Sequence, residues 1–173
     1  MNIRFALAGA FALALASAGA ARAVAAPTDP QIAHIAFTAG TIDIAAAKQA
    51  LAKSKNPKVI AFAKEMVEDH AAVNDQALAL CKKLAVTPEP NPTSLALQTA
   101  AEAKRADYAK LSGAAFDKAY AVNEVAYHKA VNGALADTLI PDARNADLKG
   151  LLQTALKLFQ EHQRHAEQLV GEL

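Results

Sequence analysis

The sequence predicts an all-α fold, an antiparallel bundle of four long helices with one short helix between the second and the third. Beyond residue 23, apolar residues recur at spacings of three and four in an alanine-rich background, which is the helical period. No segment of this region shows sustained period-two alternation, so strands are not expected. Prolines and capping residues divide the region into five helical segments.

The first 23 residues have the pattern of a cleavable signal peptide. Arg4 precedes an apolar run over residues 5–20, and the small-x-small triplet Ala21-Arg22-Ala23 follows. The run is shorter than the roughly 20 residues that a membrane-spanning helix needs. We therefore predict cleavage after Ala23, a periplasmic location, and no stable membrane insertion after cleavage.

Residues 24–173 are predicted to form a single domain, since about 150 residues supply one core of ordinary size. Loss of Arg4 and Arg22 takes the formal net charge from +1 to −1. A near-neutral domain of this kind argues against nucleic acid as a partner. The single cysteine, Cys81, excludes an intramolecular disulfide.

The first two helices are expected at about 30–54 and 57–86. Asp29 offers an N-cap before Pro30, and Asn56 before Pro57 repeats the arrangement. Because the turn between them is very short, these two helices should be antiparallel neighbours.

Three prolines between residues 88 and 92 end the second helix and form a stiff connector. A short helix at about 94–111 follows, capped by Thr93 or Ser94. The third long helix is expected at about 114–139, stopped before Pro141, and the fourth at about 146–171.

Polar residues interrupt the apolar, core-facing rows of three helices. The row of the last helix contains His162, and that of the second contains His70 and Asn74. In helix 114–139, Glu124 and His128 lie one turn apart on the same side. Imidazole and carboxylate groups should therefore point into the bundle.

Counting residues outward from each turn, at a rise of about 1.5 Å per residue, predicts which residues of two paired helices lie at the same height in the bundle. Asp43 lies 12 residues before the first turn and His70 lies 15 after it, so they can share a layer. Glu124 and His162, 18 before and 20 after the last turn, also match, whereas His128 falls about one turn away.

Two interpretations follow. The first is a divalent metal site, for zinc, iron or copper, formed by His70, Glu124, His128 and His162 with Asp43, because facing helices build metal sites from such residues. Asn74 and Tyr120 would orient these ligands through hydrogen bonds. In the second, the protein is a non-catalytic structural or stress-related envelope protein, and the same side chains form a hydrogen-bonded layer that only fixes helix packing. Metal-dependent oxidoreductase chemistry using Tyr120 or Tyr127 is a third reading, which requires an open coordination position.

Three segments resemble the bacterial exported ferritin-like domains grouped as domain-of-unknown-function family 4142, often labelled outer membrane proteins. They are FAKEMVEDHAAVNDQALALCKKL, LSGAAFDKAYAVNEVAYHKAV and FQEHQRHAEQL, with Asp69-His70 and Asn74 among the most specific residues. The resemblance implies a ferritin-like four-helix bundle with the short helix in the crossover between helices two and three. It implies no biochemical activity.

The sequence departs from the di-iron pattern of the wider ferritin-like superfamily. Val67, Val125 and Phe159 stand three positions before the histidines, so none of these three histidines belongs to a Glu-x-x-His motif. A histidine-rich mononuclear site, or none, suits the residues better. No membrane-barrel pattern or lipid anchor supports the outer-membrane label. Homodimerisation stays open, and no protein partner is indicated.

Overall fold

The computed structural model describes residues 26–173, so the predicted signal peptide lies outside the described residues. Within that range the regular elements are helices: α1 (Asp29–Lys53), α2 (Pro57–Lys83), α3 (Pro92–Ala109), α4 (Gly113–Ala134) and α6 (Ala146–Glu172). A π-helical turn (Leu135–Leu139) and α5 (Ile140–Asp142) prolong α4. The five predicted helices are therefore present, with ends shifted by at most three residues.

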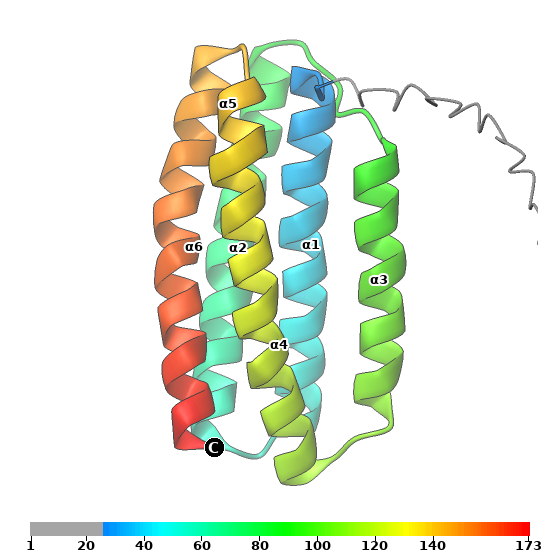
Figure 1. The fold of residues 1–173 in the computed structure, drawn as a ribbon, viewed down its shortest axis with the longest axis vertical. Helices are drawn as coiled ribbons and strands as arrows, with labels where there is room; N and C mark the ends of the chain where they lie inside the picture. Colours follow the sequence, from blue (N-terminus) through cyan, green and yellow to red (C-terminus); the bar gives the residue numbers. More distant parts are fainter. Residues whose placement is uncertain (1–25) are drawn as a thin grey trace, which may run out of the picture.

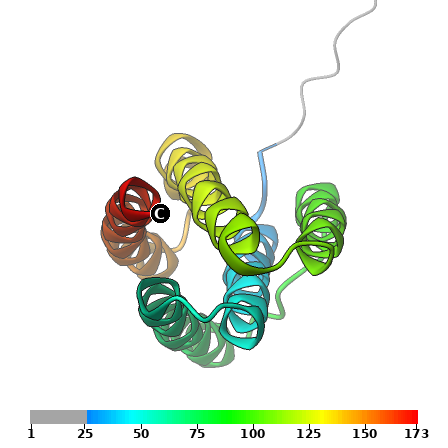
Figure 2. The same cartoon turned by 90° about the horizontal axis from the view of Figure 1, so that it is seen from below.

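Four long helices, α1, α2, α4 and α6, surround a common core, and α3 lies outside them beside α1 (Figures 1 and 2). The pairs α1–α2 and α4–α6 are antiparallel hairpins, and the crossover that contains α3 makes α2 and α4 run in the same direction (Figure 1). None of the helices found between residues 26 and 173 is long and apolar enough to cross a membrane.

The start of α1 corrects one sequence prediction. Thr28, not Asp29, is the N-cap: its hydroxyl accepts a hydrogen bond from the Gln31 N–H, and the Gln31 side chain bonds back in a capping box. The Asp29 carboxylate instead accepts hydrogen bonds from the backbone N–H groups of Arg144 and Asn145, at 2.8 and 2.9 Å. This tertiary contact joins the start of α1 to the start of α6.

The cap of α3 was also predicted at the wrong residue. Asn91, rather than Thr93 or Ser94, is the N-cap, and its side chain accepts a hydrogen bond from the Ser94 N–H. Pro92 then occupies the first helical position, where its missing N–H costs nothing. The Asn56 cap of α2 is confirmed, because Asn56 Oδ1 accepts from the Lys58 N–H.

The prediction that helix 114–139 stops before Pro141 is wrong, because helical structure continues from α4 to Asp142. Proline interrupts an α-helix because it has no N–H and its ring clashes with the carbonyl four residues earlier. Here the π turn ends at Leu139, two residues before Pro141, and the Ile140 N–H is bonded to the Leu135 carbonyl five residues back. The chain thus changes its hydrogen-bond pattern at the proline instead of ending the helix.

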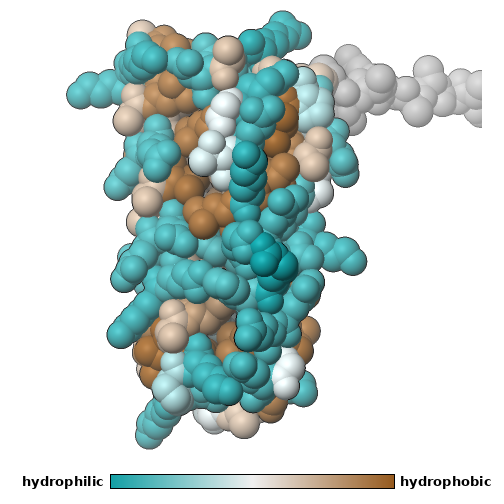
Figure 3. Space-filling view, turned by 90° about the vertical axis from the view of Figure 1, so that its left-hand side faces the viewer, coloured by the Kyte–Doolittle hydropathy of each residue, from teal (hydrophilic) through white to brown (hydrophobic). Residues whose placement is uncertain are grey.

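The hydrophobic core has two parts. The aromatic core, near the α1–α2 turn, is built around Phe62, Met66, Tyr108, Phe116 and Tyr120. The aliphatic core, near the start of α1, is built around Ile32, Leu135, Leu139, Leu148, Leu152 and Phe159. A cavity of about 970 Å³ lies beside the aliphatic core. On the face that bears α6, hydrophobic residues show between hydrophilic ones in the half that contains the aliphatic core and again near the opposite end (Figure 3).

Candidate metal centre

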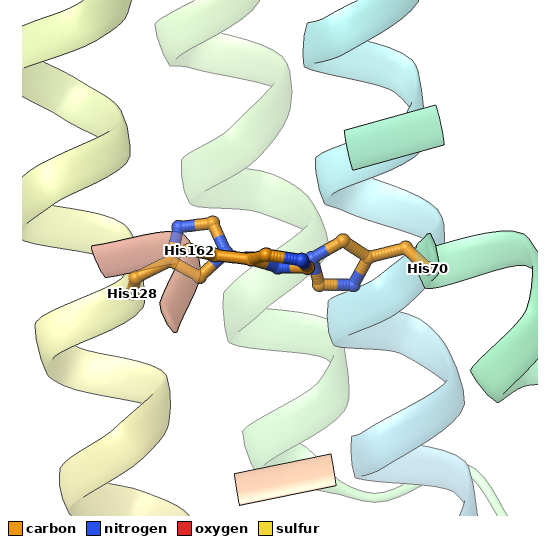
Figure 4. Close-up of side chains that lie close together, drawn as sticks. All are labelled: His70, His128 and His162. Atoms are coloured by element: carbon orange, nitrogen blue, oxygen red, sulfur yellow. Dashed lines mark hydrogen bonds between the residues drawn. The ribbon is translucent and has the colours of Figure 1, made fainter. Parts of the chain in front are cut away.

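Five buried polar residues lie at mid-height in the bundle, and we call them the polar layer. They are Asp43 from α1, His70 from α2, Glu124 and His128 from α4, and His162 from α6. Each is at most 2% exposed. Figure 4 shows the three histidines converging from their separate helices. Every helix of the bundle therefore contributes at least one potential metal ligand.

Helical periodicity explains how each side chain reaches this point. Glu124 and His128 are four residues apart, so they lie one above the other on the core side of α4. On α1, Asp43 is followed by the buried Ala46, Ala47 and Ala50. These small residues let α1 approach its neighbours closely enough for a short aspartate side chain to reach across.

Three potential metal-ligand atoms of the layer form a nearly equilateral triangle. His70 Nε2 and His128 Nε2 are 3.4 Å apart. Asp43 Oδ2 lies 3.6 Å from each of these two nitrogens. Glu124 Oε2 lies 3.7 Å from His128 Nδ1, and all ligand atoms of the Asp43–Glu124–His128 group lie within 4.8 Å of one another. The three histidines form a second group that meets the same limit.

Hydrogen bonds fix the protonation of two rings. His128 Nδ1 donates to the backbone carbonyl of Glu124 at 3.0 Å, which leaves the lone pair of a neutral ring on Nε2, the atom in the triangle. His162 Nε2 donates to Asp69 Oδ2 at 3.0 Å, which leaves the lone pair on Nδ1. Bonds of this kind, on the far side of the ring, orient metal-binding histidines in proteins.

When the carboxyl groups are ionised, several buried polar atoms of the layer have no hydrogen-bond partner in the described part of the chain. They are both carboxylate oxygens of Asp43, Oε2 of Glu124, and Nδ1 of His70 and of His162. A buried polar atom without a partner costs about 1–3 kcal/mol, so several in one layer are unusual.

Burial dominates the electrostatics of the two carboxyl groups. It raises the pKa of Asp43 to about 7, although a hydrogen bond with Glu124 opposes the rise. Burial and the nearby Asp43 raise the pKa of Glu124 well above its usual value. Two carboxyl groups this close share protons near neutral pH and titrate as a pair.

Burial acts on the histidines in the opposite direction. It lowers the pKa of His128 to about 4, with His162 adding to the effect. It also lowers the pKa of His70, which His128 and His162 lower further, and the pKa of His162, where Asp69 opposes the shift. All three imidazoles are therefore neutral at pH 7, which is the form that binds metal ions.

The structure brings together all five predicted ligand residues, with different neighbours from those expected. Asp43 and His70 share a level, as the count from the turn indicated. His128 does not lie a turn away but joins His70 and Asp43 in the triangle. Among its described contacts, His162 bonds Asp69, whereas Glu124 lies beside Asp43 and His128.

Asn74 and Tyr120, predicted to orient the ligands, have other described contacts. The Asn74 side chain donates to Thr41 Oγ1 at 3.3 Å and packs against Gly40, where a Cβ would lie 2.4 Å from Asn74 Oδ1. Gly40 therefore makes room for Asn74. Tyr120 stacks on Phe116 in the aromatic core. The Tyr127 hydroxyl donates to the Ala39 carbonyl at 2.8 Å.

Sequence reasoning missed Asp69, which orients His162, and its neighbour Glu65. The two carboxylates lie one turn apart on α2, and His162 and His165 lie one turn apart on the adjacent α6. His165 Nδ1 is 2.9 Å from Glu65 Oε1. The four-residue spacing of Glu65 and Asp69 was the available signal, since it places both on one side of their helix.

Fold and site together define a helical-bundle protein with a buried layer of metal-ligand residues at its centre. The family model of a domain of unknown function, DUF4142, matches residues 14–169, and the chain belongs to this family. No curated protein and no solved structure matches the chain.

Proposed function

We propose that this protein is an exported, ferritin-like bundle that binds one divalent transition-metal ion in the polar layer and holds or transfers it without catalytic turnover. Zinc, iron and copper all suit a site of imidazole nitrogens and carboxylate oxygens. Asp43, His70 and His128 would hold the ion, and His162 or Glu124 would supply a fourth ligand.

The triangle of donor atoms is the observation on which this proposal depends. In a tetrahedral site with bonds of about 2.0–2.2 Å, neighbouring ligand atoms lie roughly 3.3–3.6 Å apart. The three separations among His70 Nε2, His128 Nε2 and Asp43 Oδ2 are 3.4, 3.6 and 3.6 Å. These atoms therefore match one face of a tetrahedron around a zinc-sized ion.

The alternative, a layer that serves only packing, predicts that its members satisfy one another. The unpartnered Nδ1 atoms of His70 and His162 do not fit that expectation, and the carboxyl groups of Asp43 and Glu124 satisfy one another only while they hold a proton. A bound cation would give the Asp43 carboxylate a partner. Because the carboxyl groups hold protons without the ion, binding should release protons.

The chain topology supports the ferritin-like arrangement, because two antiparallel hairpins are joined by a long crossover (Figure 1). The residues three positions before the histidines, Val67, Val125 and Phe159, remove the Glu-x-x-His motifs of a di-iron centre. One ion per chain is therefore the proposed stoichiometry.

The test is elemental analysis of the mature protein, purified without chelator or histidine tag, beside an Asp43→Asn/His128→Gln variant. The wild-type protein should contain or take up one ion per chain in the polar layer, and the variant should take up none at this site. Cobalt(II) loading gives a second readout, since coordination geometry determines the visible spectrum of the ion.

His34→Gln is the matched control, because His34 lies on α1 and bonds Thr38, away from the polar layer. It should leave the stoichiometry at one. If the wild-type protein takes up no ion even after loading, the packing alternative holds and the proposal is wrong.

Export is tested separately by mass spectrometry of protein recovered from a periplasmic extract. Cleavage after Ala23 gives a chain that begins at Val24. Recovery of the intact chain from the cytoplasm would contradict this part of the proposal.

A further inference from the structure

A second group of metal-ligand residues lies at the surface between α2 and α6. Glu65 and Asp69 come from α2, and His162 and His165 come from α6. We call these four residues the outer cluster. Ligand atoms of Glu65, Asp69 and His162 lie within 4.8 Å of one another, and His165 Nδ1 lies 2.9 Å from Glu65 Oε1.

The outer cluster joins solvent-exposed side chains to a buried one. The side chains of His165, Asp69 and Glu65 are 48%, 38% and 36% exposed, whereas that of His162 is fully buried. Beyond it, the centres of the His70 and His128 rings lie 5.3 and 5.4 Å from the centre of the His162 ring. Metal-ligand side chains therefore follow one another from solvent to the buried site.

His162 belongs to both groups. Its Nε2 faces Asp69 in the outer cluster, and its buried Nδ1 has no partner within the described residues. The ring thus offers one nitrogen to the outer cluster and leaves the other free of any competing hydrogen bond.

Among residues 26–173, no lysine or arginine forms an ion pair with the two carboxylates of the outer cluster. In the part of the chain that the structure describes, their ion-pair partners are the histidines His162 and His165. Two carboxylates and two imidazoles are a ligand set suited to a divalent transition metal.

The cavity beside the aliphatic core offers a second route to the polar layer, but it is less suitable for a hydrated ion. The cavity of about 970 Å³ reaches Phe159, whose ring stacks on His70, and apolar side chains such as Val131 and Leu152 line it. The lining also includes polar residues such as Asn74 and Asp142, but it is mostly apolar, so an ion moving through it would lose much of its hydration shell at a cost.

From these observations we propose that the outer cluster is a second divalent-cation site, through which ions load the buried centre. A hydrated ion exchanges water for Glu65, Asp69 and His165, and Nε2 of His162 joins them when the neutral ring changes tautomer, releasing its proton from Nε2 and taking one up at Nδ1. The ion then passes His162 to reach His70 and His128. This loading role rests on the proposed function, whereas binding at the outer cluster does not.

Binding is tested by zinc titration of a His70→Gln/His128→Gln variant, which lacks the buried centre, with NMR detection of the His165 ring. We expect a saturable shift of His165 with one zinc ion per chain. Adding Glu65→Gln should abolish it. No shift of His165 would overturn the proposal, whether or not the buried centre binds metal.

Loading is tested by stopped-flow mixing of cobalt(II) with metal-free mature protein. A Glu65→Gln/His165→Gln variant should load about tenfold more slowly or worse, a loss typical of removing groups that support metal binding. The final occupancy of the buried centre, one ion per chain, should equal that of the wild-type protein. An unchanged rate would overturn the loading role.

Glu161→Gln is the matched control for both measurements. Glu161 lies on α6, as His165 does, and pairs with Arg164 at the surface. Its substitution therefore removes one carboxylate charge, as Glu65→Gln does, but outside the outer cluster. It should load at the wild-type rate. If it slows loading equally, general surface charge and not the cluster explains the effect.

Discussion

The two parts of the core, on either side of the polar layer, are filled in different ways. The aromatic core uses large rings in mutual contact, with Phe116 stacked on Tyr120 and Tyr108 edge-on to both. The aliphatic core adjoins a cavity of about 970 Å³ whose lining includes the small residues Ala33, Ala36, Ala39, Gly40, Ala77 and Ala155. Tight packing is thus concentrated on one side of the metal-ligand residues, and spare volume on the other.

This comparison indicates that the aromatic core holds the ligand-bearing helices in register. Tyr120 and Glu124 are one turn apart on α4, and Met66 and His70 are one turn apart on α2. Fixing the first residue of each pair therefore limits the position of the second. The aliphatic core adds stability but has room to adjust.

The largest expected effect is that of Phe116→Ala in the aromatic core. The side chain is fully buried and contacts two tyrosine rings, so its removal leaves a cavity that the surrounding rings cannot fill. We expect a loss of about 3–5 kcal/mol in the free energy of unfolding, measured by urea denaturation of the metal-free protein. Leu152→Ala, beside the existing cavity, is the comparison, and an equal or larger loss there would break the distinction between the two cores.

One substitution made on both sides of the layer should change stability in opposite directions. Ala50 and Ala36 both lie on α1, but Ala50 is completely buried in the aromatic core, whereas Ala36 is half-buried and lines the cavity. We expect Ala50→Leu to cost about 1–3 kcal/mol through overpacking. Ala36→Leu should gain about 0.5–1 kcal/mol by filling space.

Thermal unfolding of the two variants, with equal metal-free preparations, measures this difference. Both substitutions have the same effect on helix propensity, so the comparison isolates packing. Destabilisation by both variants to the same degree would mean that the cavity does not accept added volume.

Local signals made most of the fold predictable. Helical periodicity and the Asn56-Pro57 cap located the helices, because these depend on residues close in sequence. The Asn91 cap was available locally, because Asn91 before Pro92 repeats the Asn56-Pro57 arrangement, whereas the cap at Thr28 was misassigned for a physical reason. The Asp29 side chain bonds backbone groups more than a hundred positions away, and no local rule reveals such a contact.

The candidate site was predictable as a set of residues but not as a geometry. Counting from a turn gives the height of a residue along its helix, and this placed Asp43 beside His70. It does not give the rotation of the helix, so Asp69 was missed although it precedes His70 in the chain. The count for α4 also assumed a regular helix, whereas the π turn at Leu135–Leu139 changes the rise before the last hairpin.

A further expected effect is a change of stability with pH, which arises in the polar layer between the two cores. In the metal-free protein, Asp43, with a pKa of about 7, and Glu124 retain protons that the unfolded chain releases near pH 4, so both lower stability as pH rises. His128, with a pKa of about 4, His70 and His162 act oppositely up to about pH 6.5, the ordinary histidine pKa.

These contributions oppose one another between about pH 4 and 6.5, and only the carboxyl contribution remains above that range. We therefore expect the free energy of unfolding of the chelator-treated protein to fall from pH 6.5 to 8. The slope should be at most about 1.4 kcal/mol per pH unit for each proton retained. Asp43→Asn/Glu124→Gln should abolish this fall and leave a rise between pH 4 and 6.5, because only the histidines then titrate. A wild-type curve that stays level above pH 6.5 would mean that the two carboxyl groups are already ionised there, and that the layer does not hold the protons that a metal ion would displace.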